Sequence, residues 1–254
     1  MYEQFSLARR VAFVTGASRG LGYAMAEALG RAGAKVVINA RDPAQLAAAA
    51  ERLRAVGVDA KPRAFDVTDE DACKAAITAI EREHGRLDIL VNNAGANARG
   101  PFLDYKTADF EAMFRVHLQS SFVLSREAAR GMAARGFGRV IMTTSVMAKI
   151  ARPNIVGYCA AKAGLESMMR QMAVELGAKG ITVNAIAPGY FLTELNAPLV
   201  KDPAFNAMVT GRIPVGRWAE PKELGGPVVF LASDAAGYVN GHTLYVDGGL
   251  TAAF

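Results

Sequence analysis

Short apolar runs alternate with helical stretches along almost the whole chain. Apolar runs of this length, bounded by Gly, Pro or charged residues, are typical of buried strands. The pattern predicts strands at 10–16, 35–40, 60–65, 87–95, 137–145, 181–188 and 242–249. It predicts helices at 21–33, 42–57, 68–85, 107–135, 156–178 and 220–233.

Some boundaries of these elements carry their own signals. Asp42 is placed as the N-cap of the second helix, with Pro43 at its first position and Gly57 at its end. Pro188 is expected to stop the sixth strand. Residues 190–218 are predicted to be irregular, with a short helix from Pro203.

The predicted strands are continuous apolar runs rather than alternations of apolar and polar residues. Such strands are covered on both faces, which indicates a parallel sheet with helices on each side. Right-handed crossovers then give a single-domain, doubly wound, Rossmann-type α/β fold of about seven strands over residues 1–254. Ligands of such sheets bind beyond the carboxyl ends of the strands, so we expect functional residues after the first, fourth and fifth strands.

Composition excludes several other classes of protein. The 254 residues are 52% hydrophobic with a net charge of +5, but the basic residues are scattered among acids, which favours an anionic small molecule over nucleic acid. The two cysteines, Cys73 and Cys159, form no CxxC motif, which argues against a disulfide scaffold or a zinc site. No apolar run approaches the ~20 residues of a membrane span, and the N-terminus lacks an apolar signal segment, so we expect a cytoplasmic protein.

A glycine-rich stretch, TGASRGLG, follows the first strand and opens the first helix. Gly16, Gly20 and Gly22 permit a tight turn and a close backbone approach to a pyrophosphate at the helix N-terminus. Their spacing is GxxxGxG rather than the common GxGxxG fingerprint. The flanking strand and helix favour dinucleotide binding over a simple turn.

The end of the second strand bears on the type of cofactor. A carboxylate there often selects NAD by binding the ribose 2′-hydroxyl. This chain has Ala40 and then Arg41, with Arg19 in the glycine turn, and two guanidinium groups suit a 2′-phosphate. Asp42 is already explained as an N-cap, so we expect NADP(H) to be preferred, with NAD(H) as the alternative.

Tyr158 and Lys162 stand four residues apart on one side of a predicted helix, thirteen residues after Ser145. A free tyrosine has a pKa near ~10, too high for efficient proton exchange near neutrality. One positive charge at ~4 Å, with an effective dielectric constant of ~20, favours the phenolate by about 4 kcal/mol. That interaction could lower the tyrosine pKa by up to roughly 3 units, opposed in part by burial of both groups.

The ordered set of TG-x3-G-x-G, NNAG, Ser145, Y-x3-K, PG and VDGG resembles the short-chain dehydrogenase/reductase family over essentially the whole chain. The resemblance implies that Tyr158 exchanges a proton with the substrate oxygen, that Lys162 contacts the nicotinamide ribose and lowers the tyrosine pKa, and that Ser145 holds the substrate oxygen. It also implies a set of cofactor contacts: Gly16, Ser18, Arg19, Gly20, Leu21, Gly22, Arg41, Asp66, Val67, Asn93, Ala94, Gly95, Tyr158, Lys162, Pro188, Gly189 and Thr193.

The chain departs from the family pattern at His117. Family members usually have an asparagine at this place, which completes a proton relay through water to the lysine. A histidine in the middle of a helix is commonly structural, but imidazole can donate, accept and titrate near neutrality. We therefore treat His117 as a candidate catalytic residue, with altered pH dependence or impaired turnover as the alternatives.

The substrate is less defined than the chemistry. Residues 190–218 are expected to cover it, and Arg99, Lys149 and Arg152 follow strand ends near the proposed site, which would favour a sugar acid if one faces the pocket. Three stretches, INARDPAQLAAAAE, PVGRWAEPKELGGPVVFLASD and VNGHTLYVDGG, most resemble gluconate 5-dehydrogenases within the family. That resemblance implies a reaction between gluconate and 5-ketogluconate.

Three other functions stay open from the sequence. They are a 3-oxoacyl-[acyl-carrier-protein] reductase, a general ketone reductase, and a non-catalytic NADPH-binding regulator. The resemblance further implies that the helix carrying Tyr158 and its predecessor pack against another subunit, in a homotetramer.

Overall fold

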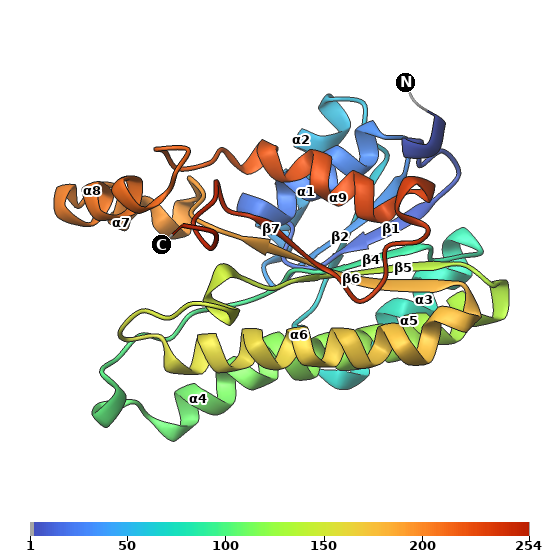
Figure 1. The fold of residues 1–254 in the computed structure, drawn as a ribbon. Coiled ribbons are helices and arrows are strands. Elements are labelled where there is room, and N and C mark those ends of the chain that lie inside the picture. Colours follow the sequence, from blue (N-terminus) through green and yellow to red (C-terminus); the bar gives the residue numbers. More distant parts are fainter. Residues whose placement is uncertain (1–2, 254) are drawn as a thin grey trace.

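The computed structural model describes residues 3–253, which form seven parallel strands with helices on both faces (Figure 1). The strands are β1 (Val11–Val14), β2 (Lys35–Ala40), β3 (Ala60–Ala64), β4 (Ile89–Asn92), β5 (Gly138–Thr143), β6 (Ile181–Pro188) and β7 (Thr243–Val246). Their order in the sheet is β3-β2-β1-β4-β5-β6-β7. The predicted doubly wound α/β fold is confirmed, including its number of strands.

The helices divide into two layers. α1 (Gly20–Arg31), α2 (Pro43–Ala55) and α9 (Gly225–Ala232) cover one face, and α3 (Glu70–His84), α5 (Ser120–Arg135) and α6 (Val156–Leu176) cover the other (Figure 1). Alternate residues of one strand enter the two cores: Ala12 and Val14 pack with the first layer, and Val11 and Phe13 with the second. This two-sided burial explains why the strands are continuous apolar runs.

The predicted helix at 107–135 is interrupted. It consists of α4 (Thr107–Phe114), a π-helical turn at Arg115–Gln119 and α5, and His117 lies in the π-helical turn. A π-turn adds a residue to the hydrogen-bonded ring and is frequent at functional sites. The sequence prediction of an uninterrupted helix was wrong at this point.

The segment 190–218 is more regular than predicted. The expected helix from Pro203 is present as α8 (Pro203–Arg212), but it is preceded by a 3-10 turn (Glu194–Asn196) and the short helix α7 (Ala197–Val200). These turns are too short to show a helical repeat in the sequence. Together they project beyond the carboxyl ends of the strands (Figure 1).

The shorter helical segments connect the main elements. The predicted helix at 220–233 begins as a 3-10 turn (Pro221–Leu224) before α9, in line with the glycines and proline that weaken it. The remaining 3-10 turns are Glu3–Phe5, Phe102–Asp104, Val146–Ala148, Gly177–Lys179 and Asp234–Ala236. Among the described residues, no helix has both the length and the apolar character to cross a membrane.

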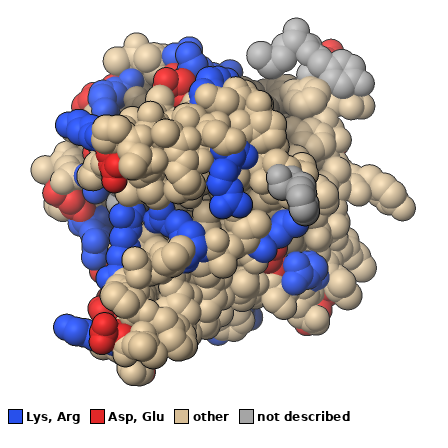
Figure 2. Space-filling view, turned by 60° about the vertical axis from the view of Figure 1, so that its left-hand side comes forward, with Lys and Arg blue, Asp and Glu red and all other residues tan. Residues whose placement is uncertain are grey.

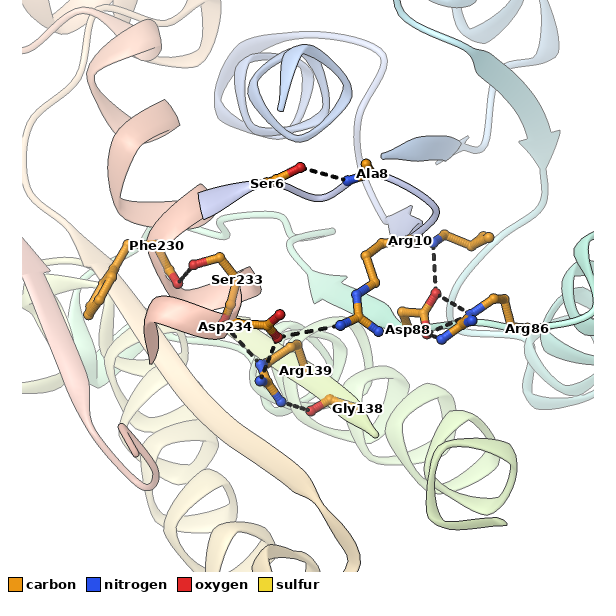
Figure 3. A network of polar contacts seen from close by, with 11 residues as sticks. Ser6, Ala8, Arg10, Arg86, Asp88, Gly138, Arg139, Phe230, Ser233 and Asp234 are labelled. Atoms are coloured by element: carbon orange, nitrogen blue, oxygen red, sulfur yellow. Dashed lines mark hydrogen bonds and ion pairs between the residues drawn. The ribbon is translucent and has the colours of Figure 1, made fainter. Parts of the chain in front are cut away.

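The amino-terminal edge of the sheet carries a network of satisfied charges (Figure 3). The buried Asp88 accepts the backbone N–H of Val11 at 2.9 Å and pairs with Arg86 at 2.6 Å. Arg10 and Arg139 converge on Asp234, at 3.4 and 3.6 Å. These charges are paired with one another and lie at the end of the strands opposite to the carboxyl ends, so their role is structural.

Candidate active site

The sheet order reverses between β1 and β4, and the carboxyl ends of these strands form the edge where such folds bind ligands. The glycine turn follows β1, the NNAG segment follows β4, Ser145 follows β5 and Gly189 follows β6. The topology therefore brings all four predicted motifs to one edge of the sheet.

The glycine turn and the NNAG segment are locked together. The Asn93 side-chain amide donates to the carbonyl oxygens of Thr15 and Gly16, at 2.9 and 3.1 Å, and the Thr15 hydroxyl accepts the N–H groups of Asn93 and Ala94. A Cβ on Gly16 would stand 2.8 Å from the Ala94 Cα, and one on Gly22 would overlap the Gly16 carbonyl oxygen. Two glycines are thus required by close approach of backbone to backbone.

The first turn of α1 suits a phosphate group. Its N-cap, Arg19, makes no side-chain cap, whereas α2 and α3 are capped by Asp42 and Asp69. The first N–H groups of α1 therefore have no side-chain acceptor, and no acidic residue lies in this turn. With the positive end of the helix dipole they fit the pyrophosphate of a dinucleotide.

The residues around this turn hold its backbone in place. Arg52, from α2, donates to the Ser18 carbonyl oxygen at 3.0 Å. Arg19 forms an exposed ion pair of 3.3 Å with Glu194, and Thr193 lies 3.8 Å from the position of a Cβ on Gly20. The segment after β6 therefore lies against the glycine turn.

Arg41 and Asp66 meet at the end of β2, where the adenosine ribose is expected. The two side chains are 3.8 Å apart, and that of Arg41 is 79% exposed. Burial raises the pKa of Asp66, but hydrogen bonds from Thr68 and the charge of Arg41 outweigh it and lower the pKa overall. The neighbouring Val67 is buried. An exposed guanidinium with one long ion pair remains available for a phosphate.

Tyr158 and Lys162 project from the first turns of α6 toward the end of β5. Lys162 is almost wholly buried; its Nζ lies 5.7 Å from the centroid of the Tyr158 ring and donates to the Thr143 carbonyl oxygen at 2.5 Å. Burial lowers the pKa of Lys162 to about 7. Ser145 hydrogen-bonds the Tyr158 hydroxyl, so the three residues expected to act together do lie together.

The predicted lowering of the Tyr158 pKa by Lys162 is not what this geometry gives. Burial raises the pKa of Tyr158, while the hydrogen bond with Ser145 and the charge of Arg152 act in the opposite direction. The Lys162 ammonium is directed at a carbonyl oxygen rather than at the phenol. A coupling of about 4 kcal/mol needs the charge ~4 Å from the phenol. Burial of both groups opposes ionisation of the phenol and offsets such a coupling.

His117 lies beside this group and is 2% exposed. Its ring meets that of Tyr158 edge to face, and its Nε2 is 2.7 Å from the Ala96 carbonyl oxygen. Burial, together with the charge of Lys162, lowers the pKa of His117 to about 3, so the imidazole is neutral near pH 7. A Cβ on Gly95 would overlap the imidazole, so this glycine makes room for the ring.

The remaining predicted contacts line the edge after β6. A Cβ on Gly189 would stand 2.8 Å from the Asp247 Cα, next to Pro188 at the end of the strand. Beyond it, the Tyr190 ring packs edge to face against Phe205 and Trp218, which ties α8 to the end of β6.

Sequence reasoning missed two residues that shape the site. Thr15 joins the two motifs by its hydroxyl, and its only signal was its place at the end of a strand before a glycine. Arg52 gave no signal at all, since it reaches Ser18 from another helix. Burial raises the pKa of Cys73 to about 12 and also raises that of the half-buried Cys159, which disfavours a thiolate at either residue.

An α/β sheet with a glycine-rich βα turn, an uncapped helix and a clustered Ser, Tyr and Lys defines a dinucleotide-dependent oxidoreductase. A family model described as enoyl-(acyl carrier protein) reductase matches residues 16–251. The chain belongs to the short-chain dehydrogenase/reductase family.

Relatives within the family share its whole length. The chain is 41% identical to gluconate 5-dehydrogenase of Gluconobacter oxydans, over 98% of this chain and 97% of that enzyme. It is 39% identical to 5-keto-D-gluconate 5-reductase of Escherichia coli, over 100% of both. A solved gluconate 5-dehydrogenase from Burkholderia cenocepacia, in complex with NADP and tartrate, superposes with a TM-score of 0.95, with 43% identity over 99% of this chain and 98% of that one.

Proposed function

We propose that the protein is an NADP(H)-dependent oxidoreductase that interconverts 5-ketogluconate, or a closely related keto sugar acid, and the corresponding secondary alcohol. The observation that carries the proposal is the cluster of Ser145, Tyr158 and Lys162 beside the uncapped N-terminus of α1. The full-length similarity to gluconate 5-dehydrogenase and 5-ketogluconate reductase supports the substrate class.

Each residue of the cluster has its own role in the reaction. Bound NADPH supplies a hydride for the carbonyl carbon. Ser145 holds the carbonyl oxygen by a hydrogen bond, and Tyr158 transfers its phenolic proton to that oxygen as negative charge develops there. Lys162, the buried cation beside the Tyr158 ring, returns a proton to the resulting phenolate. In the oxidative direction the same groups act in reverse.

Arg41 and Arg19 support the preference for NADP(H). Arg41 is exposed and held only by a weak ion pair, and Arg19 lies at the N-cap of α1. A 2′-phosphate offers both guanidinium groups a doubly charged acceptor. The complex of the Burkholderia cenocepacia enzyme with NADP agrees with this assignment.

NADPH oxidation with a panel of ketones tests the proposal. We expect 5-keto-D-gluconate to be reduced with a higher kcat/KM than an acetoacetyl thioester or a simple ketone. A higher value for the thioester would assign the protein to the acyl reductases instead. Tight NADPH binding with no turnover of any ketone would favour a regulator.

We also propose a homotetramer, as the family resemblance implied. α4, α5 and α6 border a surface groove of about 970 Å³, lined by Phe110, Phe114, Leu118, Phe122 and Met168 among others, and Phe122 is 45% exposed. A second copy of the chain is the occupant that this apolar face suits. Light scattering should give the mass of a tetramer for the wild type and a smaller mass for Phe122→Glu, while Val56→Glu, at an exposed residue that follows α2, should leave it unchanged.

A further inference from the structure

Three basic residues were candidates for the binding of an anionic substrate, and the structure places them in different surroundings. Arg99 is exposed. Lys149 lies 5.2 Å from the centroid of the Tyr245 ring and its charge acts on Glu166. Arg152 is partly buried, and none of the carboxylates in residues 3–253 forms an ion pair with it.

Arg152 contacts α8 and also acts on the catalytic phenol. Its guanidinium carbon stands 5.4 Å from the centroid of the Phe205 ring, which belongs to α8. Its charge also reaches Tyr158 and Cys159, and its backbone hydrogen-bonds the Cys159 thiol. One guanidinium is therefore in contact with α8 and within electrostatic reach of the proton donor.

The surroundings of Arg152 offer its guanidinium group an aromatic ring but, among the described residues, no carboxylate partner. The face of Phe205 offers a cation–π contact, and Phe205, Tyr190 and Tyr158 pack around one apolar cluster with Val146, Ile155 and Val209 at its centre. A guanidinium presents its N–H groups in a planar fork that matches a carboxylate with two parallel hydrogen bonds. A partly buried Arg without an acidic partner is suited to accept that partner from a ligand.

The distribution of charge over this side of the molecule also favours the binding of an anionic ligand. Figure 2 turns the end of the molecule that carries α7 and α8 toward the reader and shows Lys and Arg spread over this face, with Asp and Glu in fewer places. Such a face attracts small anions rather than repelling them.

We propose that Arg152 binds the carboxylate of the substrate, and that its contact with Phe205 couples this binding to the position of α8. The inference rests on the proposed function in one respect, namely that the ketone of the substrate reacts at Tyr158. It makes Arg152 a specificity residue, because a ketone without a carboxylate gains nothing from it. When the carboxylate docks on Arg152, the ketone end of the molecule is left to face Ser145 and Tyr158.

The test compares an acid with its neutral counterpart in variants of Arg152. 5-Keto-D-gluconate and L-sorbose carry the same ketone, and a CH2OH group replaces the carboxylate in L-sorbose. In Arg152→Met we expect kcat/KM for the acid to fall about 10- to 100-fold, as for a lost charge-assisted pair of hydrogen bonds, mainly through KM. The value for L-sorbose should change by less than about 3-fold, within the range of ordinary surface substitutions.

Two further variants make the result specific. Arg212→Met removes an exposed Arg from the same helix as Phe205 and should leave both substrates unaffected. Phe205→Leu, which removes the ring face, should raise KM for the acid by about 2- to 5-fold and not for L-sorbose. Equal losses on both substrates in Arg152→Met, or no loss on either, would overturn the inference.

Binding without turnover separates this inference from the proposed function. Calorimetry of gluconate with the NADPH-loaded protein measures the carboxylate site in a complex that cannot react. A Kd raised about 10-fold or more in Arg152→Met, and unchanged in Arg212→Met, supports the site even if 5-keto-D-gluconate proves not to be reduced. An unchanged Kd in Arg152→Met refutes it even if the wild type is an active 5-ketogluconate reductase.

Discussion

The rings of His117 and Tyr158 meet edge to face, with centroids 5.4 Å apart and an interplanar angle of 84°. Such a contact fixes the orientation of the phenol. Nε2 lies 2.7 Å from the Ala96 carbonyl oxygen and 3.4 Å from the Ala96 N–H nitrogen. The shorter contact favours a proton on Nε2, which leaves Nδ1 as an acceptor. Nδ1 is buried and has no hydrogen-bond partner among the described residues. The imidazole can thus orient Tyr158 and accept a hydrogen bond while staying neutral.

The low pKa of His117 predicts acid sensitivity of the fold. Its pKa is about 3 in the protein against ~6.5 in an unfolded chain, so the unfolded state binds the proton first and stability falls as the pH drops below about 6.5. From pH 6 to pH 4 this residue alone should cost the wild type about 2.5 kcal/mol of unfolding free energy. Urea unfolding of His117→Asn should lack that loss, whereas His242→Asn should retain it.

Because the His117 imidazole is neutral near pH 7, its replacement should not change the pH dependence of turnover. Because the imidazole does not titrate near neutrality, the apparent pKa values of kcat/KM between pH 6 and 9 should be the same in the wild type and in this variant. A shift of the profile would instead show that the imidazole takes up a proton during the reaction.

Lys162 illustrates a conflict between stability and catalysis. Its pKa of about 7 lies below the ~10.4 of a free lysine, so the buried ammonium destabilises the fold, fully below pH 7 and less as the pH rises toward 10. Lys162→Met should therefore be more stable at pH 7 by up to about 4 kcal/mol, reduced by the lost hydrogen bond to Thr143. Its kcat should fall at least about 100-fold.

Thermal unfolding across pH 7 to 10 tests whether Lys162→Met is more stable than the wild type. The advantage of Lys162→Met should shrink as the pH rises, because the wild type loses its buried charge. A variant that is less stable than the wild type at pH 7 would show that the ammonium is better solvated than its burial indicates.

The fold could be predicted from the sequence because each strand is a continuous apolar run and each crossover a recognisable helix. The π-turn at Arg115–Gln119 could not, since MFRVHLQSSF contains no Gly or Pro and a single extra residue in a helical ring leaves the apolar pattern almost intact. The i,i+4 spacing placed Tyr158 and Lys162 on one side of α6, but not the Thr143 carbonyl oxygen that holds the ammonium. Electrostatic coupling depends on burial and on competing acceptors, and neither is visible in a spacing.

Replacement of Arg41 should raise the KM for NADPH far more than the KM for NADH. The side chain is 79% exposed, so Arg41→Ala should cost little stability but should remove a charge-assisted contact with a 2′-phosphate. We expect the KM for NADPH to rise about 10- to 100-fold and that for NADH to change by less than about 2-fold. Arg54→Ala, on the neighbouring helix and paired with Glu51, serves as the matched control and should affect neither. Equal effects on both nucleotides would remove Arg41 from the 2′-phosphate site.

Alanine at Gly22 should lower the free energy of unfolding, whereas alanine at Gly211 should raise it. A Cβ on Gly22 would overlap the Gly16 carbonyl oxygen and the Asn93 amide, and the backbone of the turn must move to admit it. Gly22→Ala should therefore lose about 1–3 kcal/mol of unfolding free energy, typical of overpacking. It should also weaken NADPH binding, because it displaces the turn that we propose as the phosphate site. Gly211 is exposed in α8, and a Cβ there meets nothing within 4 Å beyond its chain neighbours, so Gly211→Ala should gain up to about 1 kcal/mol from helix propensity. Denaturant titrations with and without NADPH measure both effects. If Gly22→Ala binds NADPH as the wild type does, the tight turn serves only packing, and the dinucleotide must be held by groups other than the first turn of α1.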